Sequence, residues 1–159
     1  RDVLGSRGLG DVYKRQEYLQ QSISQNLGVK VELNTVGDYQ MFANERDNKN
    51  YDIFVGGWFS DYNDPLDFLN IMKTGVYDSY GLYSNSEYDS LIDSLTGEND
   101  NAKRLEIYQK LEDLLVAQDC GVAPLYYSDK HYYYQNWVKD FYTSSFGASQ
   151  ELYRATVEK

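Results

Sequence analysis

A run of apolar residues at positions 51–58 constrains the fold of this chain more than any other sequence feature. The run reads YDIFVGGW, and its apolar residues follow one another instead of alternating with polar ones. A strand with one solvated face alternates in polarity, whereas a strand buried on both faces does not. Gly56 and Gly57 end the run, and glycine permits another backbone to approach closely. We therefore expect a central strand that is buried on both faces of a sheet.

Helix and strand patterns alternate on either side of this run. Residues 17–27 have apolar residues at helical spacing and end at Gly28, a typical helix C-cap. Residues 29–35 alternate between apolar and polar side chains, as a half-buried strand does. This alternation predicts an α/β or α+β fold with a mixed sheet. The further patterns predict helices after Gly37-Asp38, after Asp64-Pro65, from Ser86 to Gly97 and at 101–118, and strands at 122–127, 132–134, 141–146 and 152–157.

The composition excludes several classes of partner and site. The 159 residues include 15 Lys and Arg against 25 Asp and Glu, a net charge of −10, so a basic surface for nucleic acid or anionic lipid is not expected. A single Cys rules out an internal disulfide, and a single His rules out a metal site built from several histidines. The 17 Tyr are unusual, and tyrosine has an apolar face and a polar tip that suit ligand clefts and wet interfaces.

Residues 1–16 differ in charge from the rest of the chain. They read RDVLGSRGLGDVYKRQ and carry four basic and two acidic side chains, which leaves a net charge of −12 on the other 143 residues. The stretch also resembles the adapter-derived translation that recurs at the ends of metagenomic reading frames. We expect residues 1–16 to be foreign to the protein and residues 17–159 to be a fragment of a longer one.

The residues that most often carry catalysis form no complete device. His131 has no nucleophile motif beside it, and we expect it to be structural or at the surface. Cys120 lies between a helix pattern and a strand pattern and is expected to be a small buried apolar residue. The acidic stretch 61–67 fails the calcium-loop pattern, because Pro65 takes a ligand position and Leu66 replaces the required glycine. No catalytic residue, metal or cofactor is expected.

The segment GGWFSDYNDP, residues 56–65, combines features of a ligand site. Two aromatic residues follow the glycines, and the Asp61 carboxylate comes three residues after Trp58. Ligand clefts of α/β sheets lie beyond the carboxyl ends of strands, where a carboxylate can bind a cation. Asp64 and Asp67 are instead explained as the cap and a first-turn residue of the next helix. The alternative is a turn packed by a core tryptophan, with Asp61 as an ordinary turn residue, and the two interpretations are equally supported.

The same segment resembles the W-x-x-D-Y-x-D-P-x-x-F-L hallmark of extracytoplasmic oligopeptide-binding proteins, the solute receptors of ABC importers. NLGVKVEL before it, and YDSLIDSL, RLEIYQKLEDLL and VAPLYY after it, resemble the elements that flank the hallmark in the family. The resemblance covers residues 17–159 and is specific for the broad family of peptide- and nickel-type solute receptors. The residues that match the hallmark are Trp58, Asp61, Tyr62, Asp64, Pro65, Phe68 and Leu69.

The resemblance implies roles for individual residues. In the family, the Asp three places after the Trp binds the α-ammonium group of the peptide, and this position is Asp61. Backbone groups around the Trp pair with the peptide main chain, which implicates Gly57 and Phe59, and Trp58 would line a side-chain pocket. Some relatives have an arginine three residues before the Trp that binds a peptide carboxylate. This chain has Val55 there, so anchoring of the peptide C-terminus by that route is not expected.

The resemblance also implies a whole-molecule arrangement. The fold would be the C-terminal part of a two-lobed, periplasmic-binding-protein-like (class II) fold, with residues 17–136 in the second lobe and residues 137–159 returning towards the first. Arg46 lies where some relatives place another cleft arginine. The protein would bind oligopeptides outside the cytoplasm, deliver them to ABC permease subunits and catalyse no reaction. It would contact the membrane only through an N-terminal lipid anchor that lies outside this chain.

Three alternatives stay open at this point. The same fold could bind a dipeptide, an oligosaccharide, nickel or a haem-like molecule, since an aromatic platform also suits sugars. The chain could instead be a hydrolase that uses the Asp61 carboxylate. It could also be a tyrosine-rich interaction domain without a ligand site.

Overall fold

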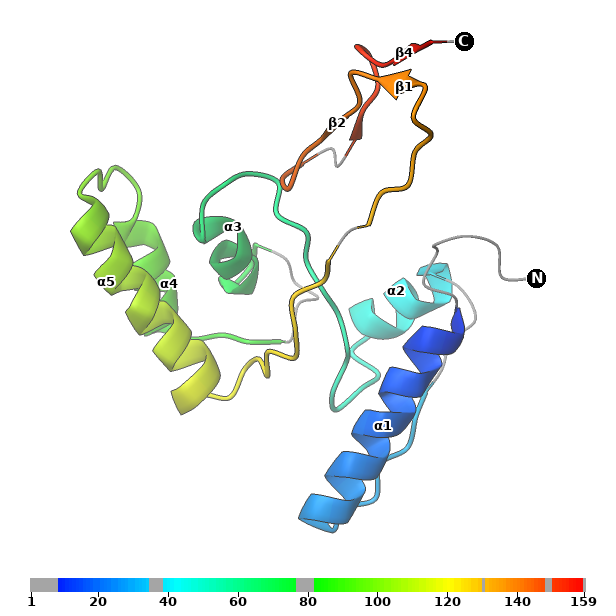
Figure 1. Ribbon diagram of the computed structural model, residues 1–159. Helices are drawn as coiled ribbons and strands as arrows, with labels where there is room; N and C mark the ends of the chain where they lie inside the picture. The colour runs from blue at the N-terminus through cyan, green and yellow to red at the C-terminus, as the bar shows by residue number, and fades with distance from the viewer. Residues whose placement is uncertain (1–8, 35–38, 77–81, 130, 148–149, 159) are drawn as a thin grey trace. The chain divides into compact units, whose positions relative to one another are not determined.

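The computed structural model describes residues 9–34, 39–76, 82–129, 131–147 and 150–158. The chain divides into two compact units, Arg1–Asn44 and Glu45–Lys159. Helices dominate the described residues, and the strands are short (Figure 1). The elements are α1 (Leu9–Leu27), α2 (Tyr39–Asp47), α3 (Leu66–Leu69), the 3-10 turn η1 (Asn70–Met72), α4 (Ser86–Ser94), α5 (Asn101–Glu112), the π-helical segment η2 (Asp113–Gln118), β1 (Val138–Lys139), β2 (Tyr142–Thr143), β3 (Gln150–Glu151) and β4 (Thr156–Val157).

The first unit is built on α1. This helix is continuous from Leu9, so it begins eight residues before the expected start at residue 17. It ends as predicted at Gly28, which has a φ of 68° and donates its backbone N–H to the Ser24 carbonyl over 3.0 Å. Glycine reaches this left-handed conformation at little steric cost, which is why it ends helices so often.

The strand predicted at 29–35 is wrong for its described residues. Residues 29–34 pair with no strand in the described part of the chain. The Gln20 side-chain amide instead donates to the Val31 carbonyl over 2.8 Å and ties the segment to α1. Alternating polarity predicts that one face of a segment is buried. It does not show whether a second strand lies beside the segment, and a ladder needs one. α2 follows as predicted, although its expected start at Gly37-Asp38 lies outside the described residues.

Two helices of the second unit, α4 and α5, are capped by side chains. The Asn85 side chain accepts hydrogen bonds from the backbone N–H groups of Glu87 (2.8 Å) and Tyr88 (3.1 Å) and so caps α4. The cap predicted at Ser86 is therefore wrong by one residue. Asn85 has the extended backbone (φ −147°) from which a side chain reaches the first free N–H groups, whereas Ser86 is already helical. Asp100 caps α5 in the same way.

The buried core joins α4, α5 and η2 with α3 and η1. Tyr88 and Leu111 are both 0% exposed, and the Tyr88 hydroxyl donates to the Leu69 carbonyl over 2.8 Å. The helix predicted at 101–118 is confirmed as α5 continued by η2. Tyr108, Leu111 and Leu115 of this helix are buried, whereas Leu105 is 57% exposed. The helix therefore enters the core only from its middle onward.

The central strand predicted at 51–58 is wrong. These residues form no ladder with any described strand, and Ile53 and Val55 are 75% and 47% exposed. Tyr51 and Phe54 pack edge to face, with ring centroids 5.2 Å apart. The buried cluster of this unit is helical, so a sheet does not cover the run. A continuous apolar run predicts burial, but the covering surface is provided by other parts of a fold.

Beyond η2 the described residues contain no helix and form two antiparallel ladders. Val138 lies opposite Val157 where β1 pairs with β4, and Tyr142 lies opposite Glu151 where β2 pairs with β3. The strands predicted at 141–146 and 152–157 are therefore confirmed in part. Those predicted at 122–127 and 132–134 take part in no ladder of the described residues, and these residues form no mixed sheet.

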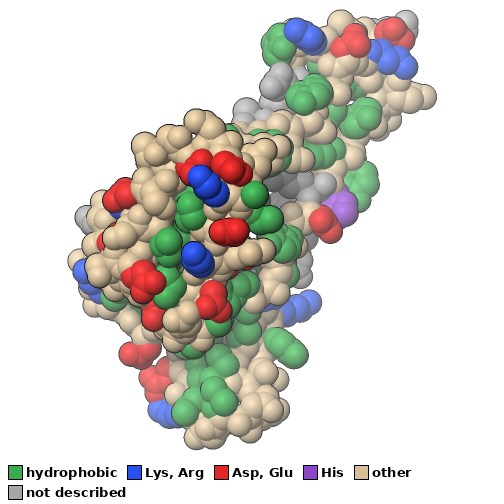
Figure 2. All heavy atoms as spheres, turned by 90° about the vertical axis from the view of Figure 1, so that its left-hand side faces the viewer, with side chains coloured by type: hydrophobic (Ala, Val, Ile, Leu, Met, Phe, Trp, Pro, Cys, Tyr) green, Lys and Arg blue, Asp and Glu red, His purple; other side chains and the backbone are tan. Residues whose placement is uncertain are grey.

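The surface carries both charges and apolar side chains. Figure 2 shows acidic and basic side chains interspersed over the face formed by α4 and α5, with hydrophobic side chains between them. His131 is exposed, and so it lies at the surface, which was one of the two places expected for it. Cys120 is exposed rather than buried, because the chain turns there with a φ of 52° after η2 has ended. Within the described ranges, no helix is long and apolar enough to cross a membrane.

Candidate ligand-binding site

The Asp67 carboxylate organises residues 58–65, which we call the WFSDYNDP loop. Its Oδ2 atom accepts the Trp58 indole N–H over 3.1 Å and the Asp61 backbone N–H over 2.9 Å. Asp67 lies in the first turn of α3 and is 6% exposed. Buried acceptors are almost always satisfied, and this one is satisfied by the loop itself. One carboxylate therefore holds both the indole ring and the Asp61 backbone.

The loop directs its residues to different sides. Trp58 is half-buried and packs against the helical core. Phe59 is 62% exposed, and Asp61 and Gly57 are exposed as well. Trp58 thus packs against the core, as in the interpretation of this segment as an ordinary turn. The exposed Asp61 carboxylate is compatible with the interpretation of the segment as a ligand site.

A residue far along the chain also contacts the loop. The Gly147 backbone N–H donates to the Ser60 carbonyl over 2.8 Å. Gly147 has a φ of 58°, and a Cβ at this position would lie 3.3 Å from the Asp61 carbonyl oxygen. A glycine fits here because of both the left-handed backbone and the close approach.

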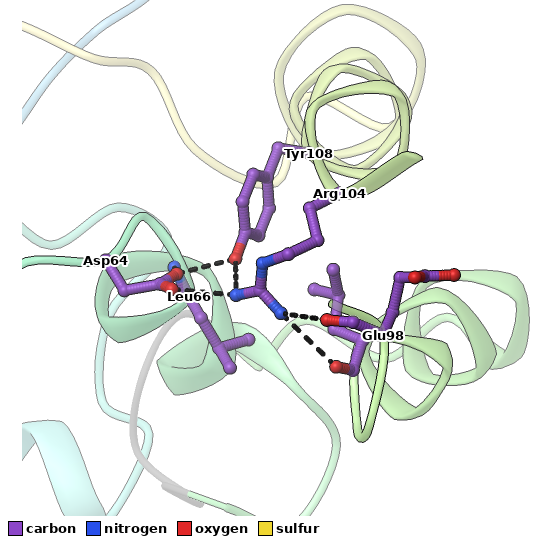
Figure 3. Close-up of polar contacts among 6 residues, drawn as sticks. Asp64, Leu66, Glu98, Arg104 and Tyr108 are labelled. Carbon is purple, nitrogen blue, oxygen red and sulfur yellow. Dashed lines mark hydrogen bonds and ion pairs between the residues drawn. The ribbon is translucent and has the colours of Figure 1, made fainter. Parts of the chain in front are cut away.

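The far end of the loop is bound to α5 by a contact that we call the Asp64 clasp. Asp64 Oδ2 lies 2.7 Å from Arg104 Nη2, and Asp64 Oδ1 accepts the Tyr108 hydroxyl over 2.5 Å. The other guanidinium nitrogen, Nη1, donates to the carbonyls of Leu95 and Glu98 over 3.3 and 3.2 Å. In Figure 3 the guanidinium group lies between Asp64 on one side and Glu98 on the other. The clasp therefore joins the loop to α5 and to the turn that precedes it.

The charges in the clasp are complementary. Asp64 also accepts the Leu66 backbone N–H over 2.9 Å, although the N-cap residue of α3 is Pro65 and not Asp64 as predicted. Burial opposes ionisation of Asp64, but hydrogen bonds from Tyr108 and Leu66 and the charge of Arg104 together lower its pKa below 3.8. Burial and the hydrogen bond to Asp64 raise the pKa of Tyr108 to about 12. An ionised carboxylate and a protonated phenol therefore coexist at neutral pH.

Three carboxylates lie near Tyr62, and one of them, that of Asp64, is paired with Arg104. Burial raises the pKa of Tyr62, and the negative charges of Asp67, Asp64 and Asp61 raise it further. The carboxylates of Asp61 and Asp67, which lie outside the Arg104 ion pair, favour a cation over an anion at this place. They do not form a metal site: in the part of the chain that the structure describes, no group of three or more His, Cys, Asp or Glu residues could hold a metal ion.

The remaining candidate lies in a different element. Arg46 is in the last turn of α2, where its Nη2 atom lies 2.9 Å from Asp47 Oδ1. Its side chain is only 16% exposed. The structure thus places Gly57, Trp58, Phe59 and Asp61 next to one another and Arg46 outside their loop.

Sequence reasoning missed three residues of this site. Asp67 was assigned only a first-turn role, and neither Arg104 nor Tyr108 was singled out. The spacing of Arg104 and Tyr108 on one face of a helix is a local signal that they act together. Their partner Asp64 lies 40 and 44 residues earlier, so no local pattern reveals it.

Comparisons with known proteins place the chain among similar sequences and structures. The family profile described as bacterial extracellular solute-binding proteins, family 5 Middle, matches residues 8–79. The oligopeptide-binding protein OppA of Bacillus subtilis (strain 168) is 31% identical over 80% of this chain and 22% of its own length. The periplasmic oligopeptide-binding protein OppA of Salmonella typhimurium is 31% identical over 80% of this chain and 23% of its own length. The chain therefore spans about a fifth of the length of these relatives.

Solved structures show the same likeness. The substrate-binding domain of an oligopeptide ABC transporter from Bacillus anthracis str. Ames has a TM-score of 0.82 and 29% identity, over 94% of this chain and 29% of that chain. The pheromone receptor PrgZ, whose mode of peptide binding is known, has a TM-score of 0.75 and 28% identity, over 92% of this chain and 28% of that chain. These matches confirm the predicted fold class, part of a periplasmic-binding-protein-like fold. The chain is thus similar to the bacterial extracellular solute-binding proteins of family 5, whose profile matches residues 8–79.

Proposed function

We propose that this chain is part of an extracytoplasmic receptor that binds oligopeptides and delivers them to an ABC importer. Relatives named oligopeptide-binding proteins, one of them named periplasmic, support the proposal. The observation that carries it is the arrangement of the WFSDYNDP loop. Asp67 holds the loop from its buried side, while the Asp61 carboxylate and the Phe59 ring are exposed on it.

In this proposal Asp61 binds the α-ammonium group of the peptide. The carboxylates around Tyr62 make the loop attractive to a cation. A charge-assisted hydrogen bond becomes stronger when a closing cleft removes water from it. Every peptide with a free amino terminus carries an α-ammonium group, so this anchor recognises peptides without reading their sequence.

The backbone beside Trp58 is proposed to bind the peptide main chain. Residues 54–60 contain no helix or strand, and Gly57 and Phe59 are exposed, which suits pairing with an extended ligand. Trp58 would form one wall of a side-chain pocket, in which bridging water tolerates different side chains. Arg46 is proposed as a further cleft residue.

Further proposals concern the rest of the receptor. Binding and release break no covalent bond, so we propose that the protein is not an enzyme and uses no cofactor. Residues 17–136 are proposed to belong to the second lobe and residues 137–159 to return towards the first, while residues 1–16 are proposed to be foreign. Lobe closure would trap the peptide and present it to permease subunits at the membrane.

The substitution Asp61→Asn in the full-length receptor tests the ammonium anchor. We expect it to weaken a peptide with a free amino terminus by about 1–3 kcal/mol, the usual loss for a hydrogen bond to a charged group. Isothermal titration calorimetry with the same peptide in free and N-acetylated form gives the comparison. Asp52→Asn, which neutralises another exposed carboxylate of the same unit, is the matched control.

Three outcomes contradict the proposal. An equal loss for free and N-acetylated peptides removes the ammonium role from Asp61. Binding of an oligosaccharide, nickel or haem, with no competition from peptides, replaces the ligand. Hydrolysis that disappears in Asp61→Asn would instead show an enzyme.

A further inference from the structure

We propose that Asp67 is a positioning residue for ligand binding. Its buried carboxylate sets the place of the Asp61 backbone, and therefore of the Asp61 carboxylate, without touching the ligand itself. The inference rests on the proposed role of Asp61 and adds the residue that gives this role its geometry.

The first observation is that two donors share one oxygen atom. Asp67 Oδ2 accepts both the Asp61 backbone N–H (2.9 Å) and the Trp58 indole N–H (3.1 Å). A displacement of this atom therefore changes the positions of the pocket wall and the ammonium anchor together. Asp67 is 6% exposed, so water does not readily replace it as the acceptor.

The second observation is that Asp67 is itself fixed. Its backbone N–H donates to the Asp64 carbonyl over 3.1 Å at the start of α3. Asp64 is in turn bound to Arg104 and Tyr108 of α5. Residues held by packing and by a second set of hydrogen bonds are those that can keep a binding group in place.

The third observation concerns the peptide unit that joins Ser60 to Asp61. Its N–H donates to Asp67, and its carbonyl accepts the Gly147 N–H over 2.8 Å. The N–H and C=O of a trans peptide point in opposite directions, so partners on both sides restrict its rotation. The peptide unit is thus pinned on both sides, and Asp61 starts from a defined backbone position.

The test is made in the full-length receptor and distinguishes two properties of the Asp67 side chain, its acceptor oxygen and its negative charge. Asp67→Asn keeps an acceptor oxygen in a side chain of the same shape, whereas Asp67→Leu keeps the branched shape, adds apolar bulk and removes the acceptor. Asp67→Ala removes the acceptor without adding apolar bulk, in case the leucine variant does not fold. Asp89→Ala is the control, because Asp89 also accepts a backbone N–H, that of Thr74, away from the loop.

Two measurements are made on each folded variant. The first is the ratio of affinities for one peptide with a free and with an N-acetylated amino terminus. The second, without ligand, is the NMR resonance of the Trp58 indole N–H, assigned with Trp58→Phe. We expect Asp67→Leu and Asp67→Ala to lower the affinity ratio about tenfold, or 1.4 kcal/mol, and to shift the indole resonance upfield. We expect Asp67→Asn and Asp89→Ala to keep the ratio within about threefold of wild type.

The outcomes separate this inference from the proposed function. An indole resonance that does not move in Asp67→Leu or Asp67→Ala overturns the inference even if peptides bind. An equal loss for both peptide forms shows a merely structural role and overturns it too. An Asp67→Asn variant as defective as Asp67→Leu would assign the effect to charge and contradict the acceptor geometry. A wild-type protein that binds no peptide overturns the proposed function, while the indole measurement still tests whether Asp67 holds the loop.

Discussion

At the scale of single residues, Gly147 shows how a distant backbone atom constrains a binding loop. Its N–H is bound to Ser60, and its missing Cβ leaves room for the Asp61 carbonyl. Gly97 has a φ of 82° but no atom within 4 Å of the place of a Cβ. Alanine at position 97 would therefore be strained only by the left-handed backbone. Alanine at position 147 would be strained in the same way and would also contact the Asp61 carbonyl.

This difference gives a prediction for two alanine substitutions. Gly97→Ala and Gly147→Ala are both expected to lower the free energy of unfolding by about 1–2 kcal/mol, because alanine is strained at positive φ. Only Gly147→Ala is expected to weaken peptide binding as well, since its Cβ lies against the Asp61 carbonyl. Urea denaturation and calorimetry of the full-length receptor measure the two effects. Equal peptide affinity in the two variants would show that the Gly147 contact does not matter for the site.

At the scale of elements, the Asp64 clasp connects the loop and α3 with α5. It combines an ion pair, a hydrogen bond from a phenol and a helix-start hydrogen bond on one carboxylate. Because the partners lie on different elements, breaking the clasp should loosen the loop without changing the helices themselves.

The lowered pKa of Asp64 predicts how stability depends on pH. A carboxyl group whose pKa is lower in the folded state contributes stability above its ordinary pKa of 3.8, and this contribution is lost as the pH falls through the lower folded value. We expect Asp64→Asn to destabilise the receptor by about 1–3 kcal/mol at pH 7. We expect the difference from wild type to shrink as the pH falls below 3.8.

Urea denaturation across this pH range measures the difference. Asp93→Asn is the control, because Asp93 forms an ion pair with Lys73 while its side chain is 66% exposed. Exposed pairs contribute little to stability. A difference between wild type and Asp64→Asn that stays constant with pH would show that ionisation of Asp64 is not what holds the clasp.

Helices were predicted better than strands, and the reason is the range of the interactions. The starts of α4 and α5 depend on side chains that bond to backbone N–H groups two or three residues away. The run at 51–58 has an equally clear pattern, yet Ile53 is 75% exposed. A helix satisfies its own backbone groups, whereas a strand needs a partner whose position the local pattern does not contain.

At the scale of the whole molecule, the size of the relatives sets the limit on what this chain can do. The chain spans 22–23% of two oligopeptide-binding relatives and 28–29% of two similar solved structures. The proposed cleft therefore has walls that other parts of the receptor would supply. Many aromatic side chains of residues 126–153 are exposed, among them Tyr127 at 97% and Tyr133 at 90%.

We accordingly predict that the isolated polypeptide of residues 17–159 does not bind peptides tightly. One loop can supply an ammonium anchor, but without a closing cleft the charges stay in water and attract weakly. Calorimetric titration with the peptide used for the full-length receptor checks this, with the full-length receptor as the positive control. Submicromolar binding by residues 17–159 would show that this part holds a complete site.

Local sequence patterns were enough to indicate the family resemblance, most of the helices and the position of the loop with Trp58 and Asp61. These features depend on residues close together in the chain, such as caps, helical spacing and the hallmark pattern. Only the tertiary structure showed that Asp67 holds Trp58 and Asp61, that Asp64 meets Arg104, and that Gly147 contacts Ser60. These contacts join residues that are up to 87 positions apart, and polar groups at such separations find their partners only when the packed core has placed the elements.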